Sequence, residues 1–170
     1  GRVWGPAVQL YTLRSEHNWG IGDFGDLEQL AVQMAGQGAD IIGVNPLHAM
    51  FSHNPAHASP YSPSSRRLLN VLYVDVQAVA EFAHCTAARQ RVAAGDFQQR
   101  LVRLRQAPLV DYPGVAAVKL EILALLHAHF AQRHLDPDGT ARDEHGQAFV
   151  DFVRHQGQAL QHHALFEAIQ

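Results

Sequence analysis

Apolar residues recur with two different periods in the first 45 positions of the chain. Over residues 8–13 they alternate with polar residues, which is the period of a half-buried strand. From Asp26 they recur at helical spacing, and a continuous apolar run at 41–44 predicts a buried strand. We therefore predict a β-loop-α-β unit, which crosses over right-handed into a parallel sheet. The apolar stripe of the helix comprises Leu27, Leu30, Ala31, Met34 and Ala35.

The predicted helix carries boundary signals at both ends. Asp26 is followed three residues later by Gln29, which matches a capping box, so we expect the helix to begin at Asp26. Gly36 and Gly38 follow the stripe and are expected to end the helix, because glycine readily adopts the conformation found after a helix terminus.

From residue 76 the pattern becomes mainly helical. Pro113 is expected in a first helical turn, and the run Asp-Pro-Asp-Gly at 136–139 predicts a tight turn. We therefore predict the α/β class, with residues 1–75 forming the first strands and helix and residues 76–170 forming a mainly helical part. The other predicted elements are a short strand over 71–74 and helices over 77–94, 96–106, 113–134 and 143–170.

Two loops, over 14–25 and 45–70, each follow a predicted strand. In a parallel α/β architecture the loops after the carboxyl ends of strands carry the ligand site, so we expect both loops on the binding face. A loop longer than about 15 residues is usually functional or disordered. The prolines and large apolar residues of the longer loop argue against disorder, so we expect it to have a function.

Tyr61 is the most informative residue of the longer loop. Pro60 and Pro63 fix the backbone on both sides of it, and hydroxyl groups, including that of Ser59, surround it. The segment predicts a rigid rim that presents an aromatic face to a polar ligand, for which a sugar is the natural candidate. The ring would stack on a pyranose face while its hydroxyl binds a sugar oxygen. A buried tyrosine whose hydroxyl binds the backbone is an equally open interpretation.

Three other positions carry candidate site residues. Trp19 is expected to be exposed because it lies in a polar loop, and it is a second candidate platform for a sugar. Asn45, at the end of the second strand, is a further candidate substrate contact. Asp75 follows the strand predicted over 71–74, where it favours an N-cap to the next helix over a site carboxylate.

The segment 20–25 matches the G-x-G-x-x-G pattern of dinucleotide-binding folds. In such a fold the first glycine ends the strand, whereas six polar or bulky residues separate Gly20 from the first strand here. Asp23 would also place a carboxylate where the phosphates must lie. A turn that leads into the first helix is the favoured interpretation, and we expect no nucleotide cofactor.

Several histidines invite a metal hypothesis, among them His48, His53, His57 and His84, the last beside Cys85. Zinc sites usually show closer pairs on one helix or cysteine knuckles. Pro55 prevents a regular helix between His53 and His57. Because the twelve histidines are scattered along the chain, we expect no metal site.

Composition sets broad limits on function. A chain of 170 residues with 47% hydrophobic residues is consistent with one ordinary globular domain. With 13 basic and 16 acidic residues, it lacks the charge excess of proteins that bind nucleic acids or anionic membranes. No apolar run approaches the roughly 20 residues of a membrane span. The single cysteine, Cys85, excludes an internal disulfide and fits a reducing, cytoplasmic compartment.

The two ends of the sequence add an expectation about its context. The chain begins without an initiating methionine or an apolar signal core, and it ends at Gln170 inside a helical pattern. We expect the chain to be a segment of a longer polypeptide, and the remainder of that polypeptide to be its partner.

The assembled motifs resemble those of the 4-alpha-glucanotransferases, also called amylomaltases or disproportionating enzymes, of glycoside hydrolase family 77 in the alpha-amylase clan. The first strand and loop, over 10–15 and 18–27, look like the opening of the family barrel, and 45–48 matches the end of its second strand. The most specific match is the sequence SPYSPSSR at 59–66, followed by Leu-Asn at 69–70 and Tyr-Val-Asp at 73–75. Weaker similarities occur at 110–112 and 163–168.

The resemblance implies part of a (β/α)8 TIM barrel that transfers alpha-1,4-glucan chains between maltooligosaccharides. Retaining chemistry of this kind needs two carboxyl groups about 5.5 Å apart, and in the family these lie on later strands. The resemblance therefore implies that this chain contains no catalytic residue and is inactive alone. It makes Tyr61 the tyrosine that packs against glucose at the cleavage subsite and Ser59 a neighbouring sugar contact. Residues 76–170 become a helical insertion that leads to the next barrel strand.

Two other hypotheses remain open at this point. The chain could be a non-catalytic carbohydrate-binding or interaction module that keeps the rim without the chemistry; acidic residues at the ends of later barrel strands would favour the enzyme instead. The G-x-G-x-x-G pattern leaves a dinucleotide-binding domain as the third hypothesis, which predicts tight binding of NAD.

Overall fold

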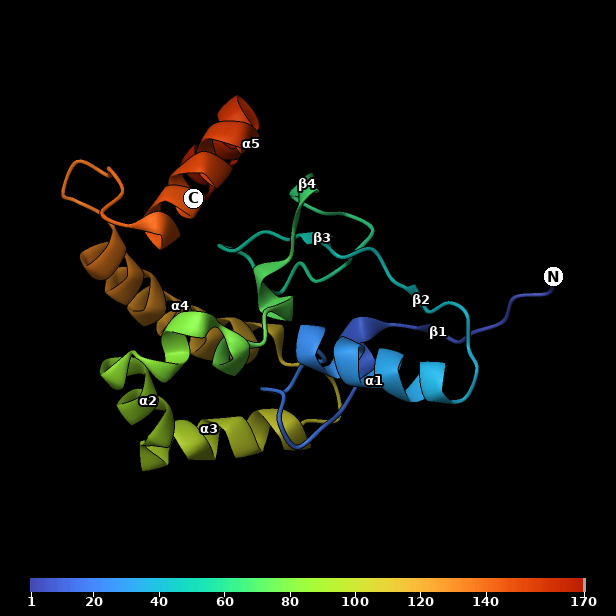
Figure 1. Ribbon diagram of the computed structural model, residues 1–170. Coiled ribbons are helices and arrows are strands. Elements are labelled where there is room, and N and C mark those ends of the chain that lie inside the picture. Colours follow the sequence, from blue (N-terminus) through green and yellow to red (C-terminus); the bar gives the residue numbers. More distant parts are fainter. Residues whose placement is uncertain (170) are drawn as a thin grey trace.

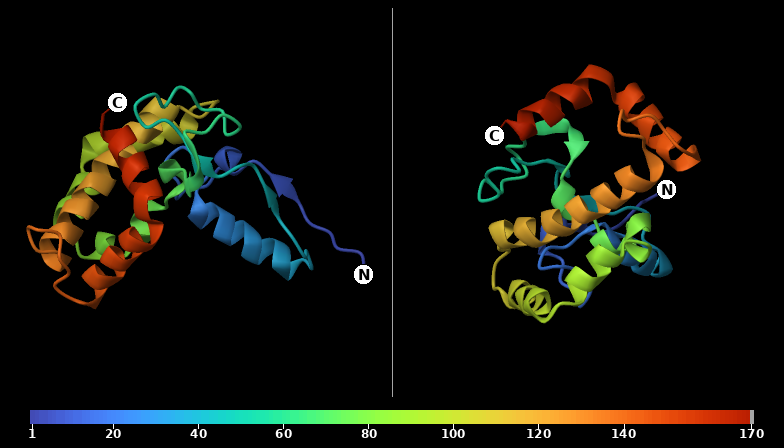
Figure 2. Two further views of the ribbon diagram at one scale, coloured as in Figure 1. Left: turned by 90° about the horizontal axis from the view of Figure 1, so that it is seen from above. Right: turned by 90° about the vertical axis from the view of Figure 1, so that its left-hand side faces the viewer.

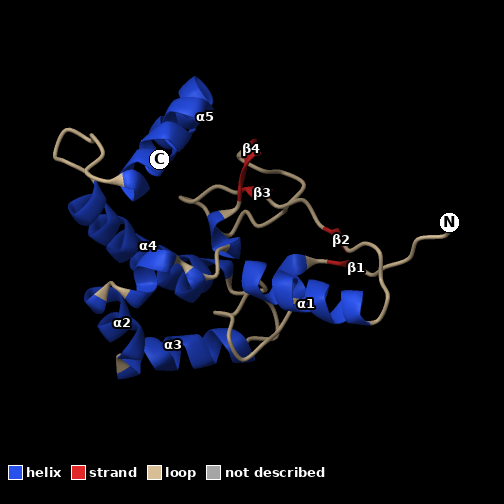
Figure 3. Cartoon of the chain, viewed as in Figure 1, coloured by secondary structure: helices blue, strands red, loops and turns tan. Residues whose placement is uncertain are grey.

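The structure is a computed structural model that describes residues 1–169. The protein is rich in helices, and its strands are short (Figures 1 and 3). The strands and α-helices are β1 (Ala7–Val8), α1 (Phe24–Gly36), β2 (Gly43–Val44), β3 (His48–Ala49), β4 (Ser65–Leu69), α2 (Thr86–Ala93), α3 (Gly95–Gln106), α4 (Tyr112–His134) and α5 (Glu144–Ala168). Four 3-10 helices connect them, η1 (Leu10–Thr12), η2 (Val71–Tyr73), η3 (Val76–Ala78) and η4 (Ala80–Ala83).

The first 45 residues form the predicted β-loop-α-β unit. Strands β1 and β2 pair in parallel, with Ala7 opposite Gly43 and Val8 opposite Val44. The first strand is shorter than predicted, because the chain turns into η1 after Val8. The Oδ1 atom of Asn45 accepts the N–H of Leu10 at 2.7 Å. This side-chain bond takes the place of a continued strand ladder.

The expectation of a buried second strand is wrong. Ile41, just before β2, is 56% exposed and Val44 is 38% exposed. Each strand of this ladder has only two residues, so the pair cannot cover its own apolar side chains. Ile41 and Val44, which suggested a buried strand, are therefore left exposed in and next to a narrow two-stranded ladder.

Helix α1 begins two residues earlier than the sequence pattern suggested. Its N-cap is Asp23, whose carboxylate accepts the backbone N–H groups of Gly25 and Asp26. Asp26 completes the capping box by accepting the N–H of Asp23 at 3.0 Å, so the predicted pairing of Asp26 with Gln29 is wrong. The helix ends at Gly36 as expected, and Gly38 follows with φ of +82°.

The chain around residues 48–74 differs from the prediction. Strands β3 and β4 form an antiparallel pair, with His48 opposite Leu69 and Ala49 opposite Ser65, where only a loop was expected. The predicted strand over 71–74 is wrong, because residues 71–73 form η2. The Asn70 side chain accepts the N–H of Leu72 at 3.0 Å and thereby caps the turn.

The helical part follows the prediction from residue 95 onward, except that α5 is interrupted by a kink at Gly157, whose φ is +58°. The helix expected over 77–94 is instead divided into η3, η4 and α2. Asp75 is confirmed as an N-cap, since its carboxylate accepts the N–H groups of Gln77 and Ala78. Pro113 lies in the first turn of α4. The predicted turn after α4 is closed by a hydrogen bond from Gly139 N–H to the Asp136 carbonyl.

Helix α4 is the centre of the packing. It contacts α2, α3, η4 and the amino-terminal part of α5, which arches away from it (Figure 2). Residues from both sides of position 75 contribute to one hydrophobic cluster, for example Leu10 and Ile21 before it and Phe97 after it. The buried residues of α4 are Val115, Ala116, Val118, Lys119, Ile122, Leu126 and Phe130.

Helix α4 is also long and apolar enough to cross a membrane by length and composition, a property that was not predicted from the sequence. About 33% of its apolar window is buried in the protein, and contacts with several neighbouring helices account for that part of its apolar character.

Candidate functional site

The side chain of Tyr61 lies at the outer rim of the segment between β3 and β4, and it is 68% exposed. The N–H of Ser62 donates to the carbonyl of Ser59 at 3.1 Å, which closes a turn with Pro60 and Tyr61 at its centre. Proline favours the second position of such a turn because its φ is fixed. The turn therefore projects Tyr61 outward, and the alternative of a buried tyrosine is wrong. Ser59 is exposed beside it.

The base of this segment is held by hydrogen bonds of Ser64. The N–H of Ser64 donates to the Ala49 carbonyl at 2.9 Å, and its hydroxyl lies within reach of the carbonyls of Ala49 and Met50 at 3.1 and 2.9 Å. Together with the β3–β4 ladder these bonds join the two sides of the segment. Tyr61 is therefore presented by a hairpin-like structure with its own internal hydrogen bonds.

Asn45, which the sequence suggested as a substrate contact, is buried. Besides the bond to Leu10, its Nδ2 atom donates to the Pro46 carbonyl at 2.8 Å and to the hydroxyl oxygen of Tyr73 at 3.2 Å. Its polar atoms are thus engaged by the protein at the point where the chain enters the Tyr61 segment.

The expected exposure of Trp19 is wrong, because its side chain is only 3% exposed. Its ring meets the ring of Phe97 on α3 edge to face, with centroids 5.4 Å apart. The guanidinium of Arg105 also donates to the carbonyl of Asn18 at 2.7 Å, which draws this loop against α3. Trp19 therefore belongs to the core and has no exposed ring face for stacking on a sugar.

Packing accounts for the three glycines of the G-x-G-x-x-G pattern. Gly20 has φ of +90°, and a Cβ atom there would lie 2.7 Å from that of Leu104. A Cβ atom at Gly22 would collide with the carbonyl of Leu10, and one at Gly25 would lie 2.5 Å from the Asp75 carboxylate. Because Asp23 already caps the helix terminus, its carboxylate lies where a dinucleotide phosphate would bind.

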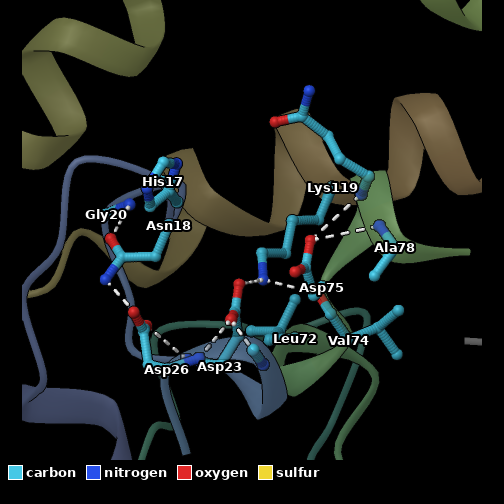
Figure 4. Close-up of polar contacts among 12 residues, drawn as sticks. His17, Asn18, Gly20, Asp23, Asp26, Leu72, Val74, Asp75, Ala78 and Lys119 are labelled. Carbon is cyan, nitrogen blue, oxygen red and sulfur yellow. Dashed lines mark hydrogen bonds and ion pairs between the residues drawn. The ribbon is translucent and has the colours of Figure 1, made fainter. Parts of the chain in front are cut away.

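A buried ion pair lies between this loop and α4 (Figure 4). The Nζ atom of Lys119 donates to Oδ2 of Asp23 at 3.1 Å and to the carbonyl of Val74 at 2.7 Å. Asp26 extends the network by accepting the amide of Asn18 at 2.9 Å. The network joins α4, the amino terminus of α1 and the chain that leaves the Tyr61 segment.

Burial opposes both charges of this pair. It raises the pKa of Asp23, against the lowering effect of the Lys119 ammonium, and it lowers the pKa of Lys119, against the raising effect of Asp23. The ion pair therefore offsets only part of the solvation that each charge loses on burial. Lys119 was not among the residues predicted from the sequence, although a signal was present: it is a cation at helical spacing from the apolar residues Val115 and Ile122.

A hollow that is partly open to solvent lies beside the Tyr61 segment. Its walls come from residues between 49 and 58, from residues 69–72, from one face of α4 that includes Tyr112, and from His163 of α5. Burial raises the pKa of Tyr112 to about 12, with the neighbouring Tyr73 and Tyr11 contributing. The wall is mainly apolar, with Ser52, Asn70, Tyr112 and His163 as its polar members.

The histidines considered as metal ligands have other surroundings. His53 and His57 pack against the ring of Phe51, with centroids 5.8 and 5.1 Å from it. Among residues 1–169, no group of three or more His, Cys, Asp or Glu side chains is arranged to hold a metal ion.

Comparison with known proteins gives consistent matches over nearly the whole chain. The family described as 4-alpha-glucanotransferase matches residues 8–170. A 4-alpha-glucanotransferase of Haemophilus influenzae is 43% identical over 168 residues, which cover 99% of this chain and 24% of that protein. One from Mycobacterium tuberculosis is 38% identical over 162 residues, covering 89% of this chain and 22% of that protein.

A solved structure shows similarity at the level of the fold. Amylomaltase from Corynebacterium glutamicum aligns with a TM-score of 0.70 and 32% identity, over 91% of this chain and 20% of that one. The chain therefore spans between a fifth and a quarter of the length of these relatives.

Proposed function

The chain belongs to the 4-alpha-glucanotransferase family, and from this membership we propose that it is part of an enzyme that transfers alpha-1,4-glucan chains between maltooligosaccharides. The observation that carries the proposal is 43% identity over 99% of the chain to a 4-alpha-glucanotransferase. The exposed aromatic rim at Tyr61 supports it, because sugar-binding sites use aromatic faces together with hydroxyl groups.

The proposal extends to the architecture and the surroundings of the chain. Strand β1, helix α1 and strand β2 would be the first unit of a (β/α)8 barrel, and residues 76–170 a helical insertion before the next strand. The parallel pairing of β1 with β2 and the similarity to amylomaltase support this assignment. The enzyme would act in the cytoplasm on alpha-glucans, without nucleic-acid or membrane partners, and the remainder of the polypeptide would complete the barrel.

The chemistry would be a retaining double displacement, in which one carboxylate attacks the sugar and a second carboxyl group acts as acid and base. We place these two groups outside the chain, in the three quarters of the relatives that it does not span. The residues of this chain would supply the rim of the donor subsite, with Tyr61 stacking on glucose and Ser59 binding a neighbouring hydroxyl.

We expect the isolated chain to show no transfer of glucose units. Incubation with maltotriose, followed by chromatography of the products, is the measurement. Glucose and longer maltooligosaccharides produced above a protein-free control would show that the chain contains its own catalytic carboxylates, and that outcome would contradict the assignment.

Replacing Tyr61 with alanine tests the rim. In calorimetric titrations with maltoheptaose we expect millimolar affinity for the wild-type chain, about −4 kcal/mol, and at least a tenfold loss for Tyr61→Ala. Tyr61→Phe separates stacking by the ring from hydrogen bonding by the hydroxyl. Leu109→Ala is the matched control, since Leu109 is 80% exposed and lies in the connection between α3 and α4. Equal affinities for wild type and Tyr61→Ala would refute the assignment of the rim.

A further inference from the structure

Asn45 has no hydrogen-bond donor left for a ligand. A side-chain amide has two N–H donors, and the Nδ2 atom of Asn45 donates to the Pro46 carbonyl and to the Tyr73 hydroxyl oxygen. Its oxygen accepts the N–H of Leu10 at 2.7 Å. The side chain is therefore used within the protein, at the position where the chain leaves β2 and enters the Tyr61 segment.

Tyr73 lies where the chain has returned from that segment. It is the last residue of η2, which follows β4, and its side chain is buried. Its ring meets the ring of Phe24 at the start of α1 edge to face, with centroids 6.1 Å apart. The ring is thus fixed by the core. Its hydroxyl oxygen accepts a hydrogen bond from Asn45, which lies 28 residues earlier in the sequence.

We propose that Asn45 and Tyr73 are positioning residues, whose hydrogen bond clamps the entry and exit of the Tyr61 segment and orients the β3–β4 pair on the body of the protein. Neither residue touches the ligand. The glucan as ligand rests on the proposed function, whereas the clamp itself rests on contacts within this chain.

Two neighbouring bonds strengthen the same base. The N–H of Asn70 donates to the Leu47 carbonyl at 2.9 Å, and the Lys119 ammonium holds the Val74 carbonyl. The Asn45–Tyr73 pair differs from these two bonds because the Asn45 side chain also accepts the N–H of Leu10, the first residue of η1. It therefore relates the orientation of the rim to the turn that follows β1.

The test is the Tyr73→Phe variant, which removes one hydroxyl group and retains the buried ring. By hydrogen exchange with mass spectrometry we expect faster exchange of the amides in residues 47–64, while those of α2 to α4 keep their protection. Ile122→Val is the control, because Ile122 is fully buried in α4 and its loss of one methylene lowers stability without touching the clamp. Rates are compared in urea concentrations that give both variants equal stability.

Asn45→Ala and the double variant complete a thermodynamic cycle. If the two side chains act through one hydrogen bond, adding Tyr73→Phe to Asn45→Ala will cause little further acceleration of amide exchange in residues 47–64. The clamp would be overturned if amides of residues 47–64 exchanged at the same rate in Tyr73→Phe as in Ile122→Val. Additive effects of Tyr73→Phe and Asn45→Ala on these exchange rates would also overturn it.

Titration with maltoheptaose distinguishes the clamp from the proposed function. With both correct, Tyr73→Phe binds about three- to tenfold more weakly than Ile122→Val at equal stability. If the folded wild type binds no maltoheptaose while the exchange pattern changes as expected, the clamp is supported and the sugar assignment fails. If Tyr73→Phe leaves amide exchange in residues 47–64 unchanged and binds maltoheptaose normally, the clamp is rejected and the sugar assignment is retained.

Discussion

Replacing Lys119 with methionine will destabilise the protein by about 3–5 kcal/mol, because it leaves the buried carboxylate of Asp23 without its cation. The substitution also removes the donor to the Val74 carbonyl. Methionine fills a similar volume to lysine. The lower free energy of unfolding therefore reflects the loss of the charge and the hydrogen bonds more than a loss of packing. Urea unfolding followed by circular dichroism measures it.

The matched control for this variant is Arg133→Met, which removes an exposed cation from the same helix. Substitutions at such surface positions usually change stability by less than about 0.5 kcal/mol. Equal stabilities of Lys119→Met and Arg133→Met would show that the buried pair contributes little.

The loss in Lys119→Met should also depend on pH in one direction. Burial raises the pKa of Asp23 in the folded state, and removing the ammonium that opposes this effect raises it further. A carboxyl group whose folded pKa lies above its unfolded pKa costs no stability below the unfolded value, and the cost grows as the pH rises through the folded value. The difference from wild type should therefore be smaller near pH 4 than at pH 7.

Replacing Phe97 with alanine is expected to cost about 3–5 kcal/mol, the usual range for removing a buried aromatic ring. Phe97 is fully buried on α3, and Trp19 packs edge to face against it. The guanidinium groups of Arg91 and Arg100 lie 5.0 and 5.6 Å from its centroid. The substitution therefore removes contacts between the loop of Trp19 and the helical part of the protein, as well as apolar burial.

Tryptophan fluorescence provides a local readout of this second variant. The chain has two tryptophans, of which Trp19 is buried beside Phe97 and Trp4 is 52% exposed. A cavity at position 97 should admit water to Trp19 and shift the emission of the folded protein to longer wavelength. Val102→Ala, at an exposed position of the same helix, should leave both stability and emission nearly unchanged. A Phe97→Ala variant as stable as Val102→Ala would contradict the assigned packing.

Elements that depend on neighbours in sequence were predicted well. Apolar periodicity placed α1 and the parallel pair β1–β2, Pro113 marked the first turn of α4, and Asp75 was identified as an N-cap. Each of these features is decided by groups within a few residues of one another. The exposure of Tyr61, which the sequence left open, also follows from local geometry, since the residue lies in a turn whose second position is proline.

Predictions failed where a distant side chain competes with a local preference. The strand expected over residues 8–13 gives way to η1, whose first N–H is bound by Asn45. Trp19 lies in a polar loop, and its burial depends on Phe97 in α3. A local pattern contains no information about such partners.

By itself the sequence determined the β-loop-α-β order of the first 45 residues, the approximate bounds of α3 and α4 and, through its motifs, the family. Only the tertiary structure decided that Trp19 belongs to the core, that Asn45 binds Tyr73 and that Lys119 is buried against Asp23. The physical reason is that helix and turn formation depend on short-range geometry, whereas burial and the pairing of polar groups depend on residues that folding brings together from distant parts of the chain.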